Sequence, residues 1–161
     1  MAIYYGDGTN SSDGRTVQTI YGYGPTGETS SSSTSYVGTA CSVDITPKAS
    51  GNTIYISVYG GTCYAPVNDG ISLTLYRKIG SGGYTAMNDT QGRPSQSFWR
   101  TFRNGATGQM GCAFQVKDSD YNSTSTITYK VYMKSINGST VQFNNHHRDA
   151  SSIQAKEVSG E

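Results

Sequence analysis

The residues that could carry acid–base or metal chemistry are few in this chain. Its two histidines, His146 and His147, are adjacent. Neighbouring residues of an extended strand point to opposite faces, so the pair cannot serve one catalytic site on a strand. No G-x-S-x-G elbow supplies a nucleophile. We interpret both histidines as polar loop residues, with a metal ion shared across a symmetry axis as the open alternative.

Asp118 and Asp120 form the one close pair of carboxylates. Two carboxyl groups about 5 to 10 Å apart could hydrolyse a glycoside if one of them lay in an apolar pocket. Tyr-Asn-Ser follows the pair, and Asp is favoured in such turns because it hydrogen-bonds to the local backbone. The glycine and the distal Glu of a calcium loop are absent. We interpret the pair as a turn, with a weak calcium site and a catalytic pair as alternatives.

Three cysteines, Cys41, Cys63 and Cys112, are widely spaced and include no C-x-x-C pair. Spacing of this kind assembles no local metal site, so we expect neither a metal nor a cofactor. Cys41 and Cys112 lie in probable strands, where reduced cysteine behaves as a small buried hydrophobe. Cys63 lies in a Gly-rich stretch that predicts a turn. A disulfide in an oxidising medium remains an alternative.

Tyrosine is the most informative surface residue, with 13 copies beside a single tryptophan. A tyrosine ring offers a large, rigid contact area and a hydroxyl, which favours interfaces. We therefore predict a ligand platform or a subunit interface, the alternative being that the rings cover the core. The candidate residues are Tyr59, Tyr64, Tyr84, Trp99 and Arg100.

Composition excludes several classes of protein. The chain has 161 residues, a net charge of +1 and only 14% charged residues. That length suits one domain. The charge gives no field for holding a phosphate backbone, so we expect no nucleic acid partner. No apolar run approaches the ~20 residues that span a bilayer, and we expect neither membrane insertion nor a secretory signal. The 11% aromatic share argues against disorder.

Alternation with period two predicts strands throughout, and no segment has helical periodicity. Strands are expected over 15–23, 36–37, 41–45, 53–59, 71–78, 98–102, 111–116, 126–136 and 151–158. Asn137-Gly138 predicts a tight hairpin whose return strand begins at Val141. Many short strands separated by turns predict an all-β, antiparallel, jelly-roll-like β-sandwich.

The first 33 residues differ from the rest, being rich in Gly, Ser, Thr and Tyr and ending in four serines. We predict a short N-terminal arm over 1–33 and a β-sandwich domain over 34–161. The arm is too small to fold alone, so it must pack on the domain, on a sister subunit or on another protein. Its candidate docking residues are Tyr4, Tyr5, Arg15, Val17 and Ile20.

The order of motifs over about residues 31–158 resembles small β-rich domains of bacteriophage tail-fibre and related virion proteins. The motifs are a Ser/Thr run ending in Tyr36-Val37, Ile45-Thr46-Pro47, the strand 53–59, Leu73-Thr74-Leu75-Tyr76-Arg77, Thr128-Tyr129-Lys130-Val131 and the closing strand 152–158. The start, residues 5–10, resembles N-termini of cyanophage structural proteins.

The resemblance implies a non-enzymatic virion protein, a homotrimeric tail-fibre, appendage or capsid-decoration subunit displayed on the particle. It carries no catalytic residues. The arm would then bind other virion proteins, and exposed loops would contact host-surface carbohydrate. The alternative function is a free carbohydrate-binding module of lectin type, with Trp99 or a surface tyrosine stacking on a sugar.

Overall fold

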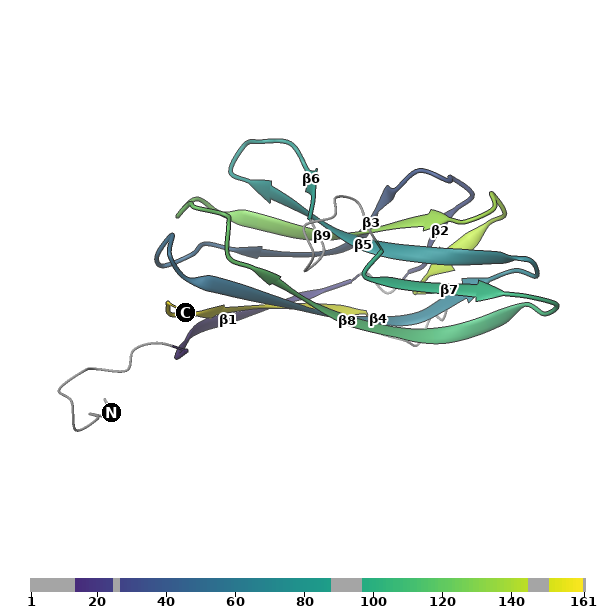
Figure 1. Cartoon of the computed structure of the whole chain (residues 1–161), viewed down its shortest axis with the longest axis horizontal. Helices are drawn as coiled ribbons and strands as arrows, with labels where there is room; N and C mark the ends of the chain where they lie inside the picture. Colours follow the sequence, from purple (N-terminus) through teal and green to yellow (C-terminus); the bar gives the residue numbers. More distant parts are fainter. Residues whose placement is uncertain (1–13, 25–26, 88–96, 145–150, 161) are drawn as a thin grey trace.

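Two antiparallel sheets pack face to face in the computed structural model, which describes residues 14–24, 27–87, 97–144 and 151–160 (Figure 1). No helix occurs in these residues. The strands are β1 (Thr16–Tyr23), β2 (Thr29–Ser31), β3 (Val37–Ile45), β4 (Thr53–Ala65), β5 (Asp69–Ile79), β6 (Thr85–Ala86), β7 (Trp99–Arg103), β8 (Gly108–Asp118), β9 (Ile127–Ser135), β10 (Val141–Phe143) and β11 (Ser152–Val158).

The strand order confirms the predicted jelly-roll sandwich. One sheet, called here the β4 sheet, has the order β1-β11-β4-β8, with β10 and β2 paired beyond the far end of β4. The other, the β9 sheet, has the order β3-β9-β5-β7, with the short β6 also on β5. We number the eight main strands (β1, β3, β4, β5, β7, β8, β9 and β11) from 1 to 8 in chain order. The two sheets then have the orders 1-8-3-6 and 2-7-4-5. This is the arrangement of two Greek keys folded into a jelly roll.

The core lies between the sheets and follows the predicted alternation. Ile54, Ile56 and Val58 of β4 are fully buried, as are Val131 and Met133 of β9. Each such side chain contributes roughly 1.5–3 kcal/mol by leaving water. The outward neighbours on β9 stay partly exposed, so one face of that strand stabilises the fold and the other is free for contacts.

The hairpin predicted at Asn137-Gly138 is wrong. The following strand, β10, pairs with β2 and β4 in the opposite sheet and not with β9. The buried Asp69 carboxylate accepts hydrogen bonds from the backbone N–H groups of Ile136, Asn137 and Ser139. Only Gly138 of the two turn residues has positive φ, at 94°, whereas the predicted turn needs two. The chain is therefore steered over the sandwich edge.

The predicted turn at Cys63 is also wrong, because this residue lies within β4 and is 1% exposed. The sequence around it is Gly-rich because β4 changes register against β8 between Tyr59 and Thr62, with Gly61 at a φ of 62°. A bulge of this kind accommodates glycine without ending the strand.

Two parts of the N-terminal segment pack on the domain itself. Strand β1 is the edge of the β4 sheet and pairs with β11 from Thr16 to Tyr23, and β2 pairs with β10. Ile20 is partly buried against the core. Tyr4 and Tyr5 lie outside the described residues. None of the residues described forms a helix long and apolar enough to cross a membrane.

Candidate functional site

The outer face of the β9 sheet gathers aromatic, cationic and hydroxyl side chains. Strand β9 presents Lys130, Tyr132 and Lys134 at every second residue, all partly exposed. Their partners on β5 are Tyr76, Thr74 and Ser72, in that order. Because alternate residues of a strand share a face, the pairing places all six side chains on the solvent side of the sandwich.

Four tyrosines on this face form a continuous row, which we call the tyrosine row (Tyr36, Tyr76, Tyr132 and Tyr84). Tyr76 and Tyr132 stack, with ring centroids 3.9 Å apart and planes 21° from parallel. Tyr36 meets Tyr76 edge-on at 6.4 Å, and Tyr84 lies 5.9 Å from Tyr132. Burial raises the pKa values of Tyr76 and Tyr132, so both phenols keep their protons at neutral pH.

Lysine ammonium groups lie over these rings. Lys134 Nζ is 4.7 Å from the centroid of Tyr36, while Lys78 and Lys130 lie 5.4 and 5.8 Å from that of Tyr84. Such contacts hold a cation beside an aromatic face. Within the described part of the chain, none of these three lysines forms a salt bridge with a carboxylate. Among the described residues, therefore, no carboxylate neutralises the positive charge of this face by direct contact.

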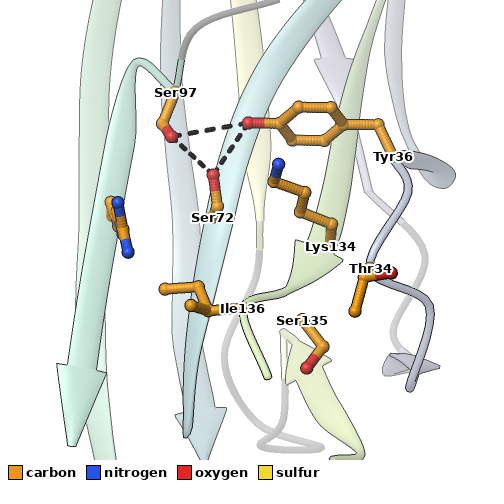
Figure 2. A pocket seen from close by; sticks show the side chains of 8 residues that line it. Thr34, Tyr36, Ser72, Ser97, Lys134, Ser135 and Ile136 are labelled. Carbon is orange, nitrogen blue, oxygen red and sulfur yellow. Dashed lines mark hydrogen bonds between the residues drawn. The ribbon is translucent and has the colours of Figure 1, made fainter. Parts of the chain in front are cut away.

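A pocket of about 260 Å³ opens at one end of the tyrosine row (Figure 2). Among the described residues, its lining is almost entirely hydroxyl and cationic and includes no carboxylate. The lining residues are Thr34, Tyr36, Ser72, Ser97, Arg100, Lys134, Ser135 and Ile136.

Three hydroxyl groups inside the pocket form a closed triangle. Tyr36 Oη lies 2.8 Å from Ser72 Oγ and 3.4 Å from Ser97 Oγ, and the two serine oxygens are 2.6 Å apart. Figure 2 shows the side chain of Lys134 passing beneath the Tyr36 ring, with its ammonium group toward this triangle. Each hydroxyl both donates and accepts, so the triangle can reorient to suit a polar ligand.

The floor of the pocket is fixed by Asp69. Its carboxylate accepts a hydrogen bond from Ser135 Oγ at 2.8 Å. Burial acts to raise the pKa of Asp69, but the hydrogen bonds from Gly70, Asn137, Ser139 and Ser135 outweigh it and lower the pKa to about 2. Asp69 is thus a structural anion that holds the end of β9 in place, and its own lone pairs are occupied.

The residues predicted as a platform are divided between the two sheets. Tyr84 and Arg100 belong to the face just described, Tyr84 in the tyrosine row and Arg100 in the pocket lining. Tyr59 and Tyr64 lie on β4 in the opposite sheet, 56% exposed and partly buried respectively. Trp99 packs against the core. Of the arm residues described, Arg15 and Val17 are exposed.

Asp118 and Asp120, interpreted from the sequence as a turn, belong to an ion-pair cluster, and Asp118 is the last residue of β8. Arg77 Nη1 contacts Asp118 Oδ1 at 2.6 Å and Asp120 Oδ1 at 2.9 Å, and Tyr129 donates to Asp118 Oδ2 at 2.6 Å. Burial, reinforced by a hydrogen bond with Asp120, raises the pKa of Asp118 despite Tyr129 and Arg77. The cluster ties β5 to β8, and Arg77 neutralises the carboxylates.

The three cysteines are free and buried, as predicted for Cys41 and Cys112. The fold brings them together. Cys63 hydrogen-bonds to Cys112, and Cys112 adds to the effect of burial in raising the pKa of Cys41. That hydrogen bond and burial raise the pKa of the Cys63 thiol. Across the described ranges, no group of three His, Cys, Asp or Glu side chains could hold a metal ion. His146 and His147 lie outside those ranges.

Sequence reasoning missed Tyr36 and Lys134 as site residues. The available signal was alternation, because Lys130, Tyr132 and Lys134 are at every second position of the strand expected over 126–136 and so share one face. Tyr36 precedes β3 and reaches the site through a contact with Ser72, 36 residues away. No local pattern encodes that approach, so the pocket emerges only from the pairing of β3, β9 and β5.

The fold and site define a jelly-roll β-sandwich with a cationic, tyrosine-lined outer face. No protein-family model matches the chain, and no curated protein matches it in sequence. Among solved structures, the chain is similar to the VP2 subviral particle of infectious bursal disease virus, with a TM-score of 0.49 and 14% identity over 98% of this chain and 37% of that chain.

Two further solved structures are similar at a lower score. The structure of the Gx strain of the same virus has a TM-score of 0.46 and 15% identity over 100% of this chain and 37% of that one. The CBM22-1 xylan-binding domain from Paenibacillus barcinonensis has a TM-score of 0.36 and 13% identity, over 92% of this chain and 98% of that domain. This chain spans 37% of the length of the two viral chains. At these identities and scores the likeness says nothing about function.

Proposed function

We propose that the protein is a non-enzymatic structural subunit of a bacteriophage particle, displayed on the particle surface, whose β9 sheet contacts host-surface glycans. The observation that carries the proposal is the tyrosine row with three lysines over its rings, which form no salt bridge with any described carboxylate. Rigid aromatic side chains with polar tips form contact surfaces at small entropic cost. Jelly rolls occur in both viral capsid and lectin domains, which fits the proposal by analogy of fold alone.

The virion assignment is supported by the motif order over 31–158, which resembles tail-fibre and related virion domains. Tail fibre, appendage and capsid decoration are the three positions this resemblance allows. The N-terminal arm, with Tyr4, Tyr5, Arg15 and Val17, would bind other virion proteins. Addition of a strand is a suitable mode, because β1 is the edge of the β4 sheet among the described strands, and an edge strand can pair with a neighbour.

The contacts of Asp118 and Asp120 support the proposal that the protein is not an enzyme. Arg77 forms an ion pair with both Asp118 and Asp120, and Tyr129 holds the second oxygen of Asp118. A glycosidase needs one carboxyl group in an apolar pocket that a substrate can reach, whereas Asp118 is 1% exposed. The described residues therefore offer this chemistry no accessible acid pair.

We assign self-association to the β4 sheet. Tyr21, Tyr23 and Tyr59 are 59%, 76% and 56% exposed on its outer face. The register places Ser152 between Tyr23 and Tyr59, so these two rings lie in one cross-strand row. Exposed aromatic side chains grouped in this way favour a subunit interface. A homotrimer would bury this face and leave the β9 sheet outward for ligand.

Light scattering on the full-length chain tests the assembly. We expect a mass of three times 17.2 kDa. The double variant Y23S/Y59S should dissociate to a monomer with an unchanged circular dichroism spectrum. Tyr84→Ser, on the other sheet, is the matched control and should remain trimeric. A monomeric native chain, or dissociation by Tyr84→Ser alone, would contradict the assignment.

Mass spectrometry and antibody labelling of purified particles of the encoding phage test the location. We expect the protein in the particle at a copy number divisible by three. If the protein is absent from particles but the free chain binds a glycan, the lectin alternative replaces the virion role. If it is present and binds no glycan, the structural role stands and the contact with host carbohydrate is wrong.

A further inference from the structure

The pocket beside the tyrosine row has the chemistry of an anion site. The described part of its lining has two cationic side chains, Lys134 and Arg100, five hydroxyl-bearing residues and no carboxylate. The hydroxyl groups both donate and accept, whereas the lysine and arginine side chains only donate, so donors are in excess among the described lining residues. An excess of cationic donors suits charged oxygens, to which cations give the strongest hydrogen bonds.

We propose that this pocket binds the acidic group of a negatively charged saccharide, a sulfate or carboxylate, while the sugar chain lies along the tyrosine row. This inference rests on the proposed function, because it names the class of glycan that the β9 sheet contacts. Lys134 and Arg100 would pair with the anionic oxygens, and the hydroxyl triangle would hydrogen-bond to the same sugar unit.

The dimensions favour a single sugar unit in the pocket. Its volume of about 260 Å³ lies below the roughly 300–1,000 Å³ of sites for drug-sized ligands. The remaining units must therefore extend outside, where Tyr76 and Tyr132 offer ring surface. Lys130 precedes Lys134 by four residues on the same face of β9, so the two residues are about 13 Å apart at the ordinary rise of a strand. Lys78 lies beyond it in the same direction.

The cations thus occupy both ends of the tyrosine row. Lys134 and Arg100 lie at the pocket, and Lys78 and Lys130 lie beside Tyr84. A chain that carries acidic groups on separate units would meet a cation at each end and aromatic surface between them. A single inorganic anion would use only the pocket, which separates the two kinds of ligand experimentally.

Titration calorimetry on the full-length protein can test the proposal with four probes. They are a sulfated heparin-type hexasaccharide, an oligogalacturonate hexamer, neutral xylohexaose and inorganic sulfate. We expect an acidic hexasaccharide to bind at least about tenfold more tightly than xylohexaose and inorganic sulfate, because charge-assisted hydrogen bonds are about twice as strong as neutral ones. Raising the salt concentration should weaken the binding.

Lys134→Gln and Arg100→Gln should each weaken binding of the acidic hexasaccharide about tenfold. Lys48→Gln is the matched control, because it removes the same charge from an exposed loop side chain. Thr46, just before this loop, hydrogen-bonds to Thr126, next to the start of β9. Lys134 lies near the opposite end of β9, so the control residue is far from the pocket. The control should change affinity by less than about twofold.

Each outcome decides between this inference and the proposed function. Equal binding of xylohexaose and the acidic probes would overturn the acidic specificity but leave the glycan contact standing. Binding of inorganic sulfate as tight as that of the hexasaccharides would reduce the site to an anion pocket. No binding of any oligosaccharide would overturn both this inference and the glycan contact, while the particle assay would still report on the structural role.

Discussion

The carboxylate of Asp69 at the start of β5 accepts a hydrogen bond from the Ser135 hydroxyl at the end of β9, with an oxygen-to-oxygen distance of 2.8 Å. The same carboxylate accepts backbone N–H bonds from Gly70, Ile136, Asn137 and Ser139. One fully buried side chain thus sets both the crossing between the sheets and the floor of the pocket.

Asp69→Asn should destabilise the fold by about 2–4 kcal/mol, since one carboxylate oxygen is replaced by an NH₂ group that faces donors and leaves them unpaired. Urea denaturation at pH 7 measures the loss. Asp44→Asn is the control, because Asp44 is exposed on β3 and should change stability by less than about 0.5 kcal/mol. Equal stabilities of the two variants would contradict the role of Asp69.

Asp69 should also determine how the free energy of unfolding depends on pH in acid. Its pKa is lowered from 3.8 to about 2 in the folded protein. A lowered carboxyl pKa stabilises the fold above the ordinary value, and this contribution disappears as the pH falls toward 2. The expected loss is about 2 kcal/mol between about pH 4 and pH 2, at ~1.4 kcal/mol per pKa unit. The difference between native protein and Asp69→Asn, measured by urea denaturation across this range, should shrink accordingly.

Substitution of Arg77 should lower the free energy of unfolding far more than substitution of Asp120, the more exposed of its two partners. Arg77→Met leaves the buried carboxylate of Asp118 without its counter-ion, and we expect a loss of about 3 kcal/mol. Asp120→Asn removes the charge of a side chain that is 77% exposed, so the loss should be under about 1 kcal/mol. Thermal unfolding of both variants at neutral pH makes the comparison, and a larger effect at Asp120 would contradict it.

Much of the fold could be predicted from alternation alone. Ile127, Tyr129, Val131 and Met133 are buried at every second position, which fixes the inward face of β9 before any contact is known. The order of the strands in the two sheets follows a jelly roll because connections between such strands have few unstrained solutions. The predicted strands over 53–59 and 111–116 lie within the longer β4 and β8.

What the sequence could not predict depends on a distant partner. Asn137-Gly138 has the composition of a hairpin, but the backbone N–H of Asn137 donates to Asp69, 68 residues away, and that of Gly138 donates to Ser135 Oγ. Ser72 lies on the outer face of β5, yet it is 1% exposed because Tyr36 and Ser97, both distant in sequence, contact it. Local propensity cannot anticipate contacts of this range, and the candidate pocket consists of them.

The three thiols should be unreactive in the native protein. Burial raises the pKa of Cys41 to about 11, whereas the hydrogen bond with Cys63 lowers the pKa of Cys112. All three side chains are nevertheless at most 5% exposed, so a reagent cannot reach the sulfur atoms in the folded protein. We expect no reaction with a thiol-specific dye in the native state and three equivalents in urea. Rapid labelling of even one cysteine in the native protein would show that the core opens more easily than its packing indicates.

Gly60→Ala should destabilise the centre of the sandwich. A Cβ atom at this position would lie 2.1 Å from Cys112 Sγ and 2.7 Å from Phe143 Cε2. Both neighbours are buried in the core and cannot move away freely, so overpacking should cost about 1–3 kcal/mol. Gly51→Ala meets no atom within 4 Å and is the control. It should leave stability unchanged or raise it by up to about 1 kcal/mol. If both variants unfold at the same urea concentration, the space beside Cys112 is larger than the close approach of β4 and β8 implies.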